Sequence, residues 1–347
     1  MPRRHGHWQR GAVTRTSRHA VPATSGIAGS LKFALALALL CPCLSAAQQP
    51  AYPVRPIRII VGFPAGSGTD LLARFVGARL TERVAQQVVV DNRPGANGII
   101  ATGLTAKAAP DGYTLQFMST SHTMNAAVHK LPFDPVRSFT PVMMLAAGPL
   151  VLVAHPAFPP GSAQGLIDLA RGKPDTITYA VSGTGGVNHF AGALFARIAG
   201  VRLINVPYKG GPQALTDLIG GQVQVMFGTA AITLAQVRAG RLKALGVSGA
   251  QRTPLLPEVP TIAESGAPGY AMNIWWGVLA PAGMSAALVT RLNSEIGGIL
   301  AQPESAQRLA AEGAEPSPLA GAAFARLLSA EIEKWTRVAR DANIRVD

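Results

Sequence analysis

The sequence has only two cysteines, and its first 47 residues contain no acidic residue. Both cysteines, Cys41 and Cys43, fall in this acid-free stretch, so the chain that follows has none. Without thiols, that remainder can form neither disulfides nor thiolate metal sites. Its histidines also lack the Cys/His or His-Glu-x-x-His spacing of a zinc centre. We therefore expect no metal and no cofactor.

The first 47 residues combine six basic side chains with the apolar run 33–44 and the small residues Ser45 and Ala47. This pattern predicts a secretory signal peptide that is cleaved after Ala47. An amphipathic membrane anchor is the alternative, but the apolar run is too short to span a bilayer. Neither cysteine follows the small residue that a lipidation site requires. We expect an exported protein, located in the periplasm of a Gram-negative cell.

The basic charge of the chain is concentrated in that same segment. Removing it takes away six of the 31 basic residues and none of the 18 acidic ones, which lowers the formal net charge from +13 to +7. The remaining charges are scattered, and no Lys/Arg run with interleaved aromatic residues is left. This distribution argues against a nucleic-acid groove. It favours anionic ligands only through a weak field that salt screens.

About 300 residues follow the signal segment, which is more than one hydrophobic core usually organises. Short β-branched runs alternate with helical patterns, as in 57–62 then 70–84 and 176–180 then 188–200, and the last third is mainly helical. The alternation predicts an α/β protein with parallel sheets in two lobes. Two apolar stretches, near 142–155 and 269–276, could cross between the lobes. We expect lobe 1 to comprise 48–150 and 275–347, and lobe 2 to comprise 151–274.

A glycine-rich corner, Phe63–Asp70, joins the first apolar run to the first amphipathic run. Glycines relax the backbone there, and Thr69 or Asp70 can cap the helix that follows. The free amides and the helix dipole would then face an anion. A small carboxylate is the natural guest, although Asp70 could equally serve only to stabilise the first turn of its helix.

A second corner of the same kind spans Tyr179–His189. Neither corner has the Lys-Ser/Thr of a phosphate loop or the full Gly-x-Gly-x-x-Gly of a dinucleotide site, so bulky polyphosphates are disfavoured. Each corner taken alone could be only a tight turn with a capping residue. Two of them in one chain favour a binding site.

Ser182, His189 and Asp217 raise the alternative of a hydrolase. Ala180 stands where the first glycine of a Gly-x-Ser-x-Gly elbow would be, so that motif is absent. We therefore expect no enzyme activity, with Ser-dependent hydrolysis as a minor alternative.

Beyond the signal segment, the chain resembles the Bug receptors, the substrate-binding proteins of tripartite tricarboxylate transporters. The matching stretches are Tyr52–Asp70, Val89–Gly98, Pro110–Tyr113, Asn125, Leu131–Pro135, Tyr179–His189, Val206–Gly211, Leu215–Phe227, Leu256–Glu264, Gly266, Ala280–Gly283 and Glu331–Trp335. The resemblance implies a type II periplasmic-binding-protein fold, with a discontinuous first lobe and a ligand cleft between two lobes that close. It also implies a small organic acid as ligand and the membrane permease subunits as partners, and we expect a monomer.

The resemblance also assigns the ligand contacts, mostly to main-chain amides and hydroxyls. In lobe 1 they are Phe63, Ala65, Gly68, Thr69 and Asp70, assisted by Ser119 and Ser121. In lobe 2 they are Ser182, Gly183, Thr184, His189 and Tyr208. The chain carries Gly228 where relatives usually have Asp, which disfavours amino-acid ligands. A sensor that docks on a membrane kinase is the alternative function for the same fold.

Overall fold

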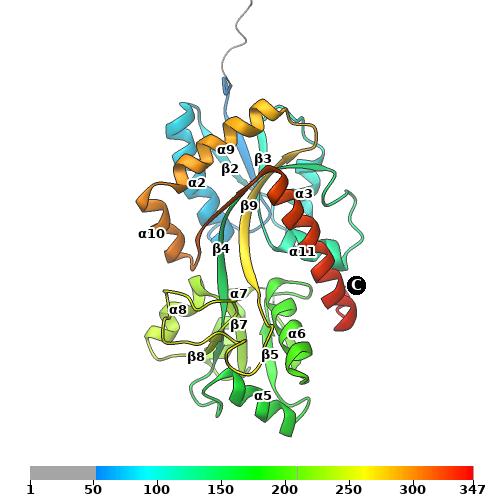
Figure 1. The fold of residues 1–347 in the computed structure, drawn as a ribbon, viewed down its shortest axis with the longest axis vertical. Helices are drawn as coiled ribbons and strands as arrows, with labels where there is room; N and C mark the ends of the chain where they lie inside the picture. Colours follow the sequence, from blue (N-terminus) through cyan, green and yellow to red (C-terminus); the bar gives the residue numbers. More distant parts are fainter. Residues whose placement is uncertain (1–51, 209, 347) are drawn as a thin grey trace, which may run out of the picture. The chain divides into compact units, whose positions relative to one another are not determined.

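Two groups of hydrogen-bonded strands organise the chain in the computed structural model, which describes residues 52–208 and 210–346 (Figure 1). The predicted signal peptide, 1–47, lies outside the described residues. Within the described ranges, ten strands follow the order β2-β1-β3-β9-β4-β7-β5-β6, with β10 and β8 each paired to β4. No helix in these ranges is both long enough and apolar enough to cross a bilayer.

The first lobe is built on parallel pairing at its outer edge. There β1 (Ile57–Val61) runs parallel to both β2 (Val88–Asn92) and β3 (Thr114–Ser119). Antiparallel pairs follow, formed by β3 with β9 (Asn273–Pro281) and by β4 (Phe139–Ala154) with β9 and with β10 (Glu315–Ala320). Its helices are α2 (Gly68–Val84), η2 (Ala96–Gly98), α3 (Ile99–Ala106), α4 (Ser121–Val128), α9 (Ala286–Leu300), α10 (Pro303–Ala311) and α11 (Gly321–Asp341).

The second lobe repeats the same plan with fewer elements. Its central strand β5 (Thr178–Val181) runs parallel to β6 (Ile204–Pro207) and to β7 (Val225–Thr229). The end of β4 pairs antiparallel with β7 and with β8 (Lys243–Val247). Its helices are α5 (Ala163–Gly172), α6 (Val187–Ala199), α7 (Gly211–Ile219) and α8 (Ala230–Arg238).

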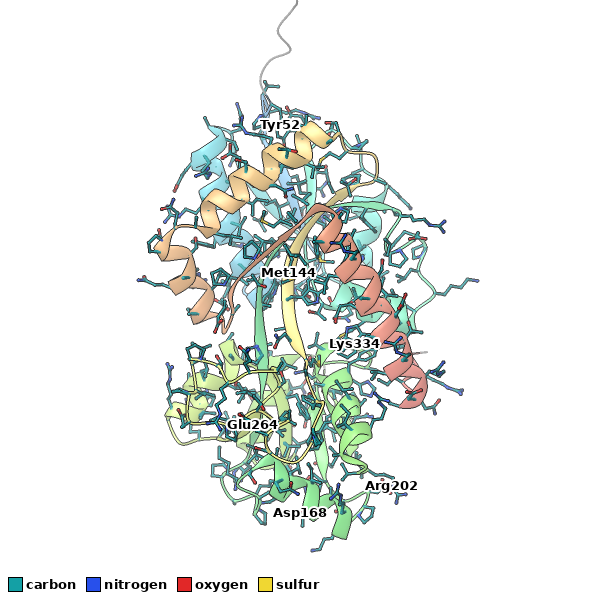
Figure 2. The ribbon with its side chains drawn as sticks, viewed as in Figure 1. Tyr52, Met144, Asp168, Arg202, Glu264 and Lys334 are labelled. Atoms are coloured by element: carbon teal, nitrogen blue, oxygen red, sulfur yellow. The ribbon has the colours of Figure 1, made fainter. Side chains whose placement is uncertain are left out.

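Strands β4 and β9 pass from one lobe to the other. Residues 139–149 of β4 pair with β9, whereas residues 150–154 pair with β7, so the partner changes at Pro149 and Leu150. Figure 2 shows Met144 on the first-lobe part of β4, and Asp168 and Glu264 in the second lobe. The chain is therefore an α/β protein of two lobes joined by long crossover strands. The predicted limits of 150 and 274 stay a prediction.

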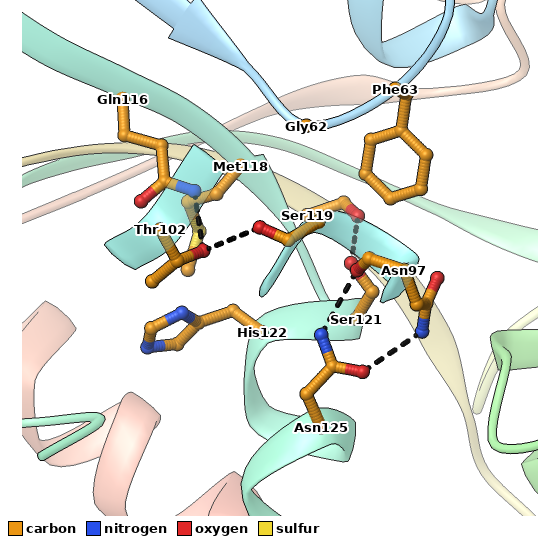
Figure 3. Close-up of a pocket in the computed structure, with 11 residues that line it drawn as sticks. Gly62, Phe63, Asn97, Thr102, Gln116, Met118, Ser119, Ser121, His122 and Asn125 are labelled. Carbon is orange, nitrogen blue, oxygen red and sulfur yellow. Dashed lines mark hydrogen bonds between the residues drawn. The ribbon is translucent and has the colours of Figure 1, made fainter. Parts of the chain in front are cut away.

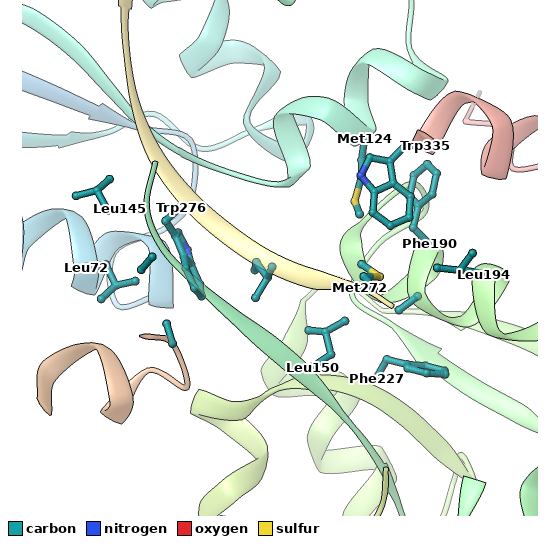
Figure 4. Close-up of a cluster of buried hydrophobic side chains, with 14 of the residues drawn as sticks. Leu72, Met124, Leu145, Leu150, Phe190, Leu194, Phe227, Met272, Trp276 and Trp335 are labelled. Carbon is teal, nitrogen blue, oxygen red and sulfur yellow. The ribbon is translucent and has the colours of Figure 1, made fainter. Parts of the chain in front are cut away.

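A continuous apolar cluster runs along the crossover strands (Figure 4). It includes Leu72 and Trp276 on the first-lobe side, and Leu150 and Phe227 on the second-lobe side. Strand β1 is buried at four of its five positions, which is why its apolar run is nearly unbroken. The two glycine-rich corners follow the carboxyl ends of β1 and β5, next to this cluster.

Three local predictions differ from the structure. Helix α2 begins at Gly68 and is capped by Ser67, so the capping assigned to Thr69 or Asp70 was wrong. The crossover stretch predicted near 142–155 begins earlier, at Phe139, and forms one strand of 16 residues, because strands of both lobes pair with it. Strand β10 lies within the third of the chain predicted as mainly helical, and its Pro316 and Pro318 are tolerated because it pairs only with β4.

Candidate functional site

The first glycine-rich corner connects the carboxyl end of β1 to α2. Here the amides of Ala65, Gly68 and Thr69 make no hydrogen bond to any other residue within 52–208 and 210–346. Helix α2 continues for 17 residues behind two of these amides, so its dipole adds partial positive charge at the same place. The corner therefore carries three amides without a partner among these residues, and their predicted role in binding an anion stays a prediction.

Asp70 does not face that opening. Its Oδ2 accepts hydrogen bonds from the Gly66 amide at 2.8 Å and from Arg74 Nε at 3.0 Å, and its Oδ1 accepts one from Asn92 Nδ2 at 2.8 Å. Burial alone would raise the pKa of the Asp70 carboxyl, but these bonds from Arg74, Gly66 and Asn92 outweigh it and lower that pKa. Asp70 thus braces the corner through Gly66, Arg74 and Asn92, and its predicted contact with a ligand stays a prediction.

Asp70→Asn is expected to lower the free energy of unfolding by about 1.5–3 kcal/mol, because a buried, charge-assisted set of hydrogen bonds loses its charge. Urea unfolding at neutral pH measures the change. Asp168→Asn is the matched control, since Asp168 is exposed on α5 and bonds only to Gln164. Equal midpoints for the two variants would contradict the bracing role.

Ser119 and Ser121 lie behind the first corner, at the end of β3 and the start of α4 (Figure 3). Their hydroxyl oxygens are 3.0 Å apart, and both residues are buried. With Phe63 and Gln116 they line a cavity of about 10 Å³, which has room for roughly one water molecule. The Oε1 of Gln116 has no hydrogen-bond partner among the described residues. In this structure the two serines pack behind the first corner and support it, and their hydroxyl groups are not exposed.

His122 follows on the same helix and is fully enclosed. Its Nε2 lies 2.7 Å from the Pro135 carbonyl oxygen, and its ring packs edge-on against Phe139. Burial lowers the pKa of His122 to about 4, against a weaker opposing effect of the Pro135 bond. The imidazole is therefore neutral in the folded protein at pH 6, whereas in the unfolded chain it begins to take up a proton near pH 6.5.

Because this pKa is lowered by folding, the stability it contributes is present above pH 6.5 and is lost as the pH falls towards 4. The loss amounts to about 3 kcal/mol. We expect the unfolding free energy of the wild type to fall by that much more than that of His122→Gln over this interval. Urea titrations at half-unit pH steps measure the difference, and parallel pH profiles would contradict it.

The second corner connects the carboxyl end of β5 to α6. The amides of Ser182, Gly183 and Thr184 have no hydrogen-bond partner in the described part of the chain. Gly183 has a φ of 126°, a conformation that side chains disfavour, and a Cβ placed there would meet nothing within 4 Å. The corner is thus held open by backbone geometry, again in front of a helix N-terminus.

The side chains of this corner are largely engaged with the protein. The Ser182 hydroxyl donates to Asn188 Oδ1, and the Asn188 amide nitrogen donates to the Phe227 carbonyl oxygen. His189 Nδ1 accepts the Gly185 amide at 3.2 Å, and burial lowers the pKa of His189. Ser182 and His189 share no hydrogen bond with each other. The contact between nucleophile and base that a hydrolase requires is therefore missing from the described residues.

Tyr208 lies beside the same corner, because its amide donates to the Val181 carbonyl oxygen at 2.8 Å. Its phenol hydrogen-bonds to Asp217, and burial together with that carboxylate raises the pKa of Tyr208. Asp217 is thus the partner of Tyr208. Ser182, His189 and Asp217, the residues considered for hydrolysis, each contact a different neighbour.

Helix α4 links the two corners. Ser121 begins this helix next to the first corner, and Val128 ends it. A Cβ placed on Gly185, in the second corner, would lie 3.3 Å from Val128 Cγ2. The eight residues of α4 have a rise of roughly 10 Å between the first and the last, so one short helix contacts both corners.

Several residues that shape the corners were not among the site residues predicted from the sequence. Asn92 holds the Phe63 carbonyl oxygen and Asp70, Trp276 Nε1 donates to Thr69 Oγ1 at 3.2 Å, and Asn188 holds Ser182. Asn92 stands at a turn signal, which could have marked it. The contact of Trp276 with Thr69 joins residues 207 positions apart, and no local pattern predicts it.

Two α/β lobes joined by β4 and β9, with glycine-rich corners after parallel strands, define a periplasmic binding protein of the two-lobed type. Comparisons agree with this class. A family model described as the tripartite tricarboxylate transporter family receptor, TctC, matches residues 72–344. The chain belongs to this family, and the resemblance to the Bug receptors is confirmed.

Individual relatives are similar over most of their length. Protein BugT of Bordetella pertussis is 34% identical over 298 residues, which are 85% of this chain and 91% of that protein. The structure of Rpa4515 of R. palustris with adipate is 36% identical, with a TM-score of 0.78, and the match covers 85% of this chain and 99% of that one. MatC (Rpa3494) from Rhodopseudomonas palustris with bound malate is 32% identical, with a TM-score of 0.74, over 83% and 99% of the two chains.

Proposed function

We propose that this protein is a periplasmic receptor that captures a small organic carboxylate between its lobes and delivers it to a membrane transporter. The observation that carries the proposal is the pair of corners whose amides are unpaired, at 65, 68 and 69 in one lobe and at 182–184 in the other. Gly68 and Thr69 are the first residues of α2, where a negative oxygen is stabilised, and 182–184 lie in the loop that leads into α6.

The energetics are adequate for such a receptor. A hydrogen bond from an amide to a charged oxygen is worth about 1.5–3 kcal/mol. Four or five of them therefore suffice for micromolar binding, which corresponds to about 8 kcal/mol, once the cost of lobe closure is subtracted. Ser182 would contribute mainly through its backbone amide, because its side chain is engaged with Asn188. Tyr208 has its amide engaged with Val181 and its phenol with Asp217, so it would contribute mainly by shaping the corner.

The family and the ligands of its structural neighbours support the choice of ligand class. One neighbour holds adipate and another holds malate, and both of these are dicarboxylates. Family membership supports the permease subunits of a tripartite tricarboxylate transporter as the partner. The protein would act as an exported monomer without catalytic turnover.

Gly68 offers a test of the first corner. It is the first residue of α2, where proline is tolerated, and the preceding Ser67 has φ −70° and ψ 155°, the extended conformation that a following proline requires. Gly68→Pro therefore removes one unpaired amide hydrogen without breaking an intrahelical bond. Gly68→Ala is the matched control, because it keeps that hydrogen.

Isothermal titration of refolded protein with a panel of mono-, di- and tricarboxylates measures the result. We expect at least one acid to bind the wild type, and Gly68→Pro to bind it at least tenfold more weakly than Gly68→Ala does, with similar thermal midpoints for all three. If no acid in the panel produced heat, the receptor proposal would fail. If Gly68→Pro bound as well as the wild type, the first corner would not be the carboxylate site.

A further inference from the structure

A buried carboxylate lies against the first corner, and it comes from a distant part of the chain. Glu312 follows the last residue of α10 and is only 7% exposed. A Cβ placed on Gly68 would lie 3.5 Å from Glu312 Oε2. Figure 1 shows the end of α10 at the edge of the first lobe that faces α8. An acidic group therefore stands beside the unpaired amides of α2.

Close backbone contacts fix the position of this carboxylate. The Glu312 amide donates to the Leu309 carbonyl oxygen at 3.0 Å, and the next residue, Gly313, has a φ of 73°. A Cβ on Gly313 would lie 2.1 Å from Ala230 Cβ, and a Cβ on Gly148 would lie 2.0 Å from the Gly313 oxygen. Residue 313 is thus wedged between a crossover strand and the start of α8, and Glu312 cannot easily move away from Gly68.

The two oxygens of this carboxylate have different surroundings. Oε1 lies 3.3 Å from an Arg308 guanidinium nitrogen, whereas Oε2 makes no hydrogen bond to any residue that the structure describes. Thr69, also buried, accepts a hydrogen bond from Trp276, and its own hydroxyl proton has no acceptor among the described residues. An unpaired acceptor and unpaired donors therefore stand side by side at one helix N-terminus.

This pairing has a chemical consequence. A bound carboxylate on the Gly68 and Thr69 amides would approach the Glu312 carboxylate, and two like charges within a few ångströms disfavour each other. A hydroxyl group next to the ligand carboxylate would offset this repulsion, because its proton can be donated to Oε2 while the ligand carboxylate oxygens accept from the amides. A site that is built to pair with a hydroxyl discriminates strongly against the analogue that lacks it.

We propose, resting on the function proposed above, that Glu312 is a specificity-determining residue that accepts a hydrogen bond from a hydroxyl adjacent to the bound carboxylate. The receptor then selects 2-hydroxycarboxylates over their unsubstituted counterparts. Arg308 orients the carboxylate through Oε1 and leaves Oε2 for the ligand.

Matched acid pairs test this selection. Isothermal titration compares succinate with 2-hydroxysuccinate, and glutarate with 2-hydroxyglutarate, on the wild type, Glu312→Gln and Glu312→Leu. Glu315→Gln is the control, because Glu315 is an exposed acid three residues further along the chain. Thermal midpoints establish that each variant is folded, and the leucine variant separates loss of the acceptor from loss of the charge.

In the wild type and in Glu315→Gln we expect a preference of about tenfold or more for the hydroxylated member of a pair, the size of one hydrogen bond to a charged group. In Glu312→Leu the preference should fall to about twofold or less, and in Glu312→Gln the unsubstituted acid should bind more tightly than it does to the wild type. Binding of the acids with no hydroxyl preference, or with one that survives in Glu312→Leu, would overturn this inference alone. Binding of none of them would overturn it together with the proposed function.

Discussion

Gly148→Ala is expected to destabilise the protein by about 3 kcal/mol or more, at the upper end of the usual cost of overpacking. The added methyl carbon would lie 2.0 Å from the Gly313 carbonyl oxygen and 3.0 Å from Ala314 Cα, and both of these are backbone atoms that no side-chain rotation can move. Strand β4 changes its pairing partner one residue later, so the backbone there is held from both sides. Urea or thermal unfolding measures the loss.

Gly161→Ala is the control for that substitution. Gly161 lies in the segment before α5, and a Cβ placed on it would meet nothing within 4 Å. We expect its midpoint to stay within experimental error of the wild type. If Gly148→Ala and Gly161→Ala unfolded at the same midpoint, the backbone at Gly313 could move away from residue 148 without loss of stability. The reason for regarding Glu312 as fixed would then be removed as well.

Trp335→Ala should cost about 3–5 kcal/mol of unfolding free energy, which is typical of an aromatic side chain removed from a core. Trp335 on α11 is fully buried and contacts the Phe190 ring of α6 edge-on, with ring centroids 5.4 Å apart. Its indole nitrogen donates to Glu331 Oε2 at 2.7 Å. Since α11 belongs to the first lobe and α6 to the second, the cavity would open between elements of both.

Trp335→Phe separates the contributions of the ring and of the hydrogen bond. It keeps an aromatic ring against Phe190 and loses the bond to Glu331, so we expect well under half of the destabilisation seen with alanine. Chemical unfolding of the two variants side by side gives the comparison. An alanine variant no less stable than the phenylalanine variant would mean that α11 can collapse onto α6 and fill the space.

The sequence predicted the parts of the molecule that local patterns encode. The alternation of apolar and helical runs indicated the α/β class and the crossover stretches, and the glycines at 66, 68, 183 and 185 marked both corners. Unpaired amides are found at those corners because short parallel strands end there and helices begin. The participation of Ser182, Thr69 and the other predicted contacts in ligand binding stays a prediction.

Patterns between distant residues were beyond the reach of the sequence. Asp70 has the same local context whether it faces a ligand or a guanidinium, and only the placement of Arg74 and Asn92 around it decides the outcome. Glu312 looks like an ordinary surface acid at a helix end, and its burial against Gly68 depends on a contact across more than 240 positions of the chain. Strand β10 was not predicted because it contains prolines. A proline destabilises a strand in the middle of a sheet but is tolerated at an edge, and the sequence does not show which position a strand occupies.

Gly228 shows how one small residue limits ligand chemistry. A Cβ at this position of β7 would lie 2.3 Å from the Thr233 methyl carbon, so an aspartate cannot be accommodated while Thr233 keeps its rotamer. The acid that the resemblance places there would therefore require Thr233 to change its rotamer. The second lobe offers no carboxylate at that point, which is consistent with a ligand held by amides.

The pairing of β4 with β9 determines how the lobes can move. The two strands are hydrogen-bonded side by side from Phe139 and Pro281 to Pro149 and Asn273, with register shifts near 142 and 145. Strand β10 pairs with β4 as far as Ala147 and β3 pairs with β9 as far as Trp276, so only the short part with Gly148 and Pro149 opposite Ile274 and Asn273 is two-stranded. This short part bends more easily across its flat face than within its plane, because the latter would stretch one strand against the other. We therefore expect the lobes to close by hinge bending about a single axis. Both corners would then reach a ligand in a reproducible orientation.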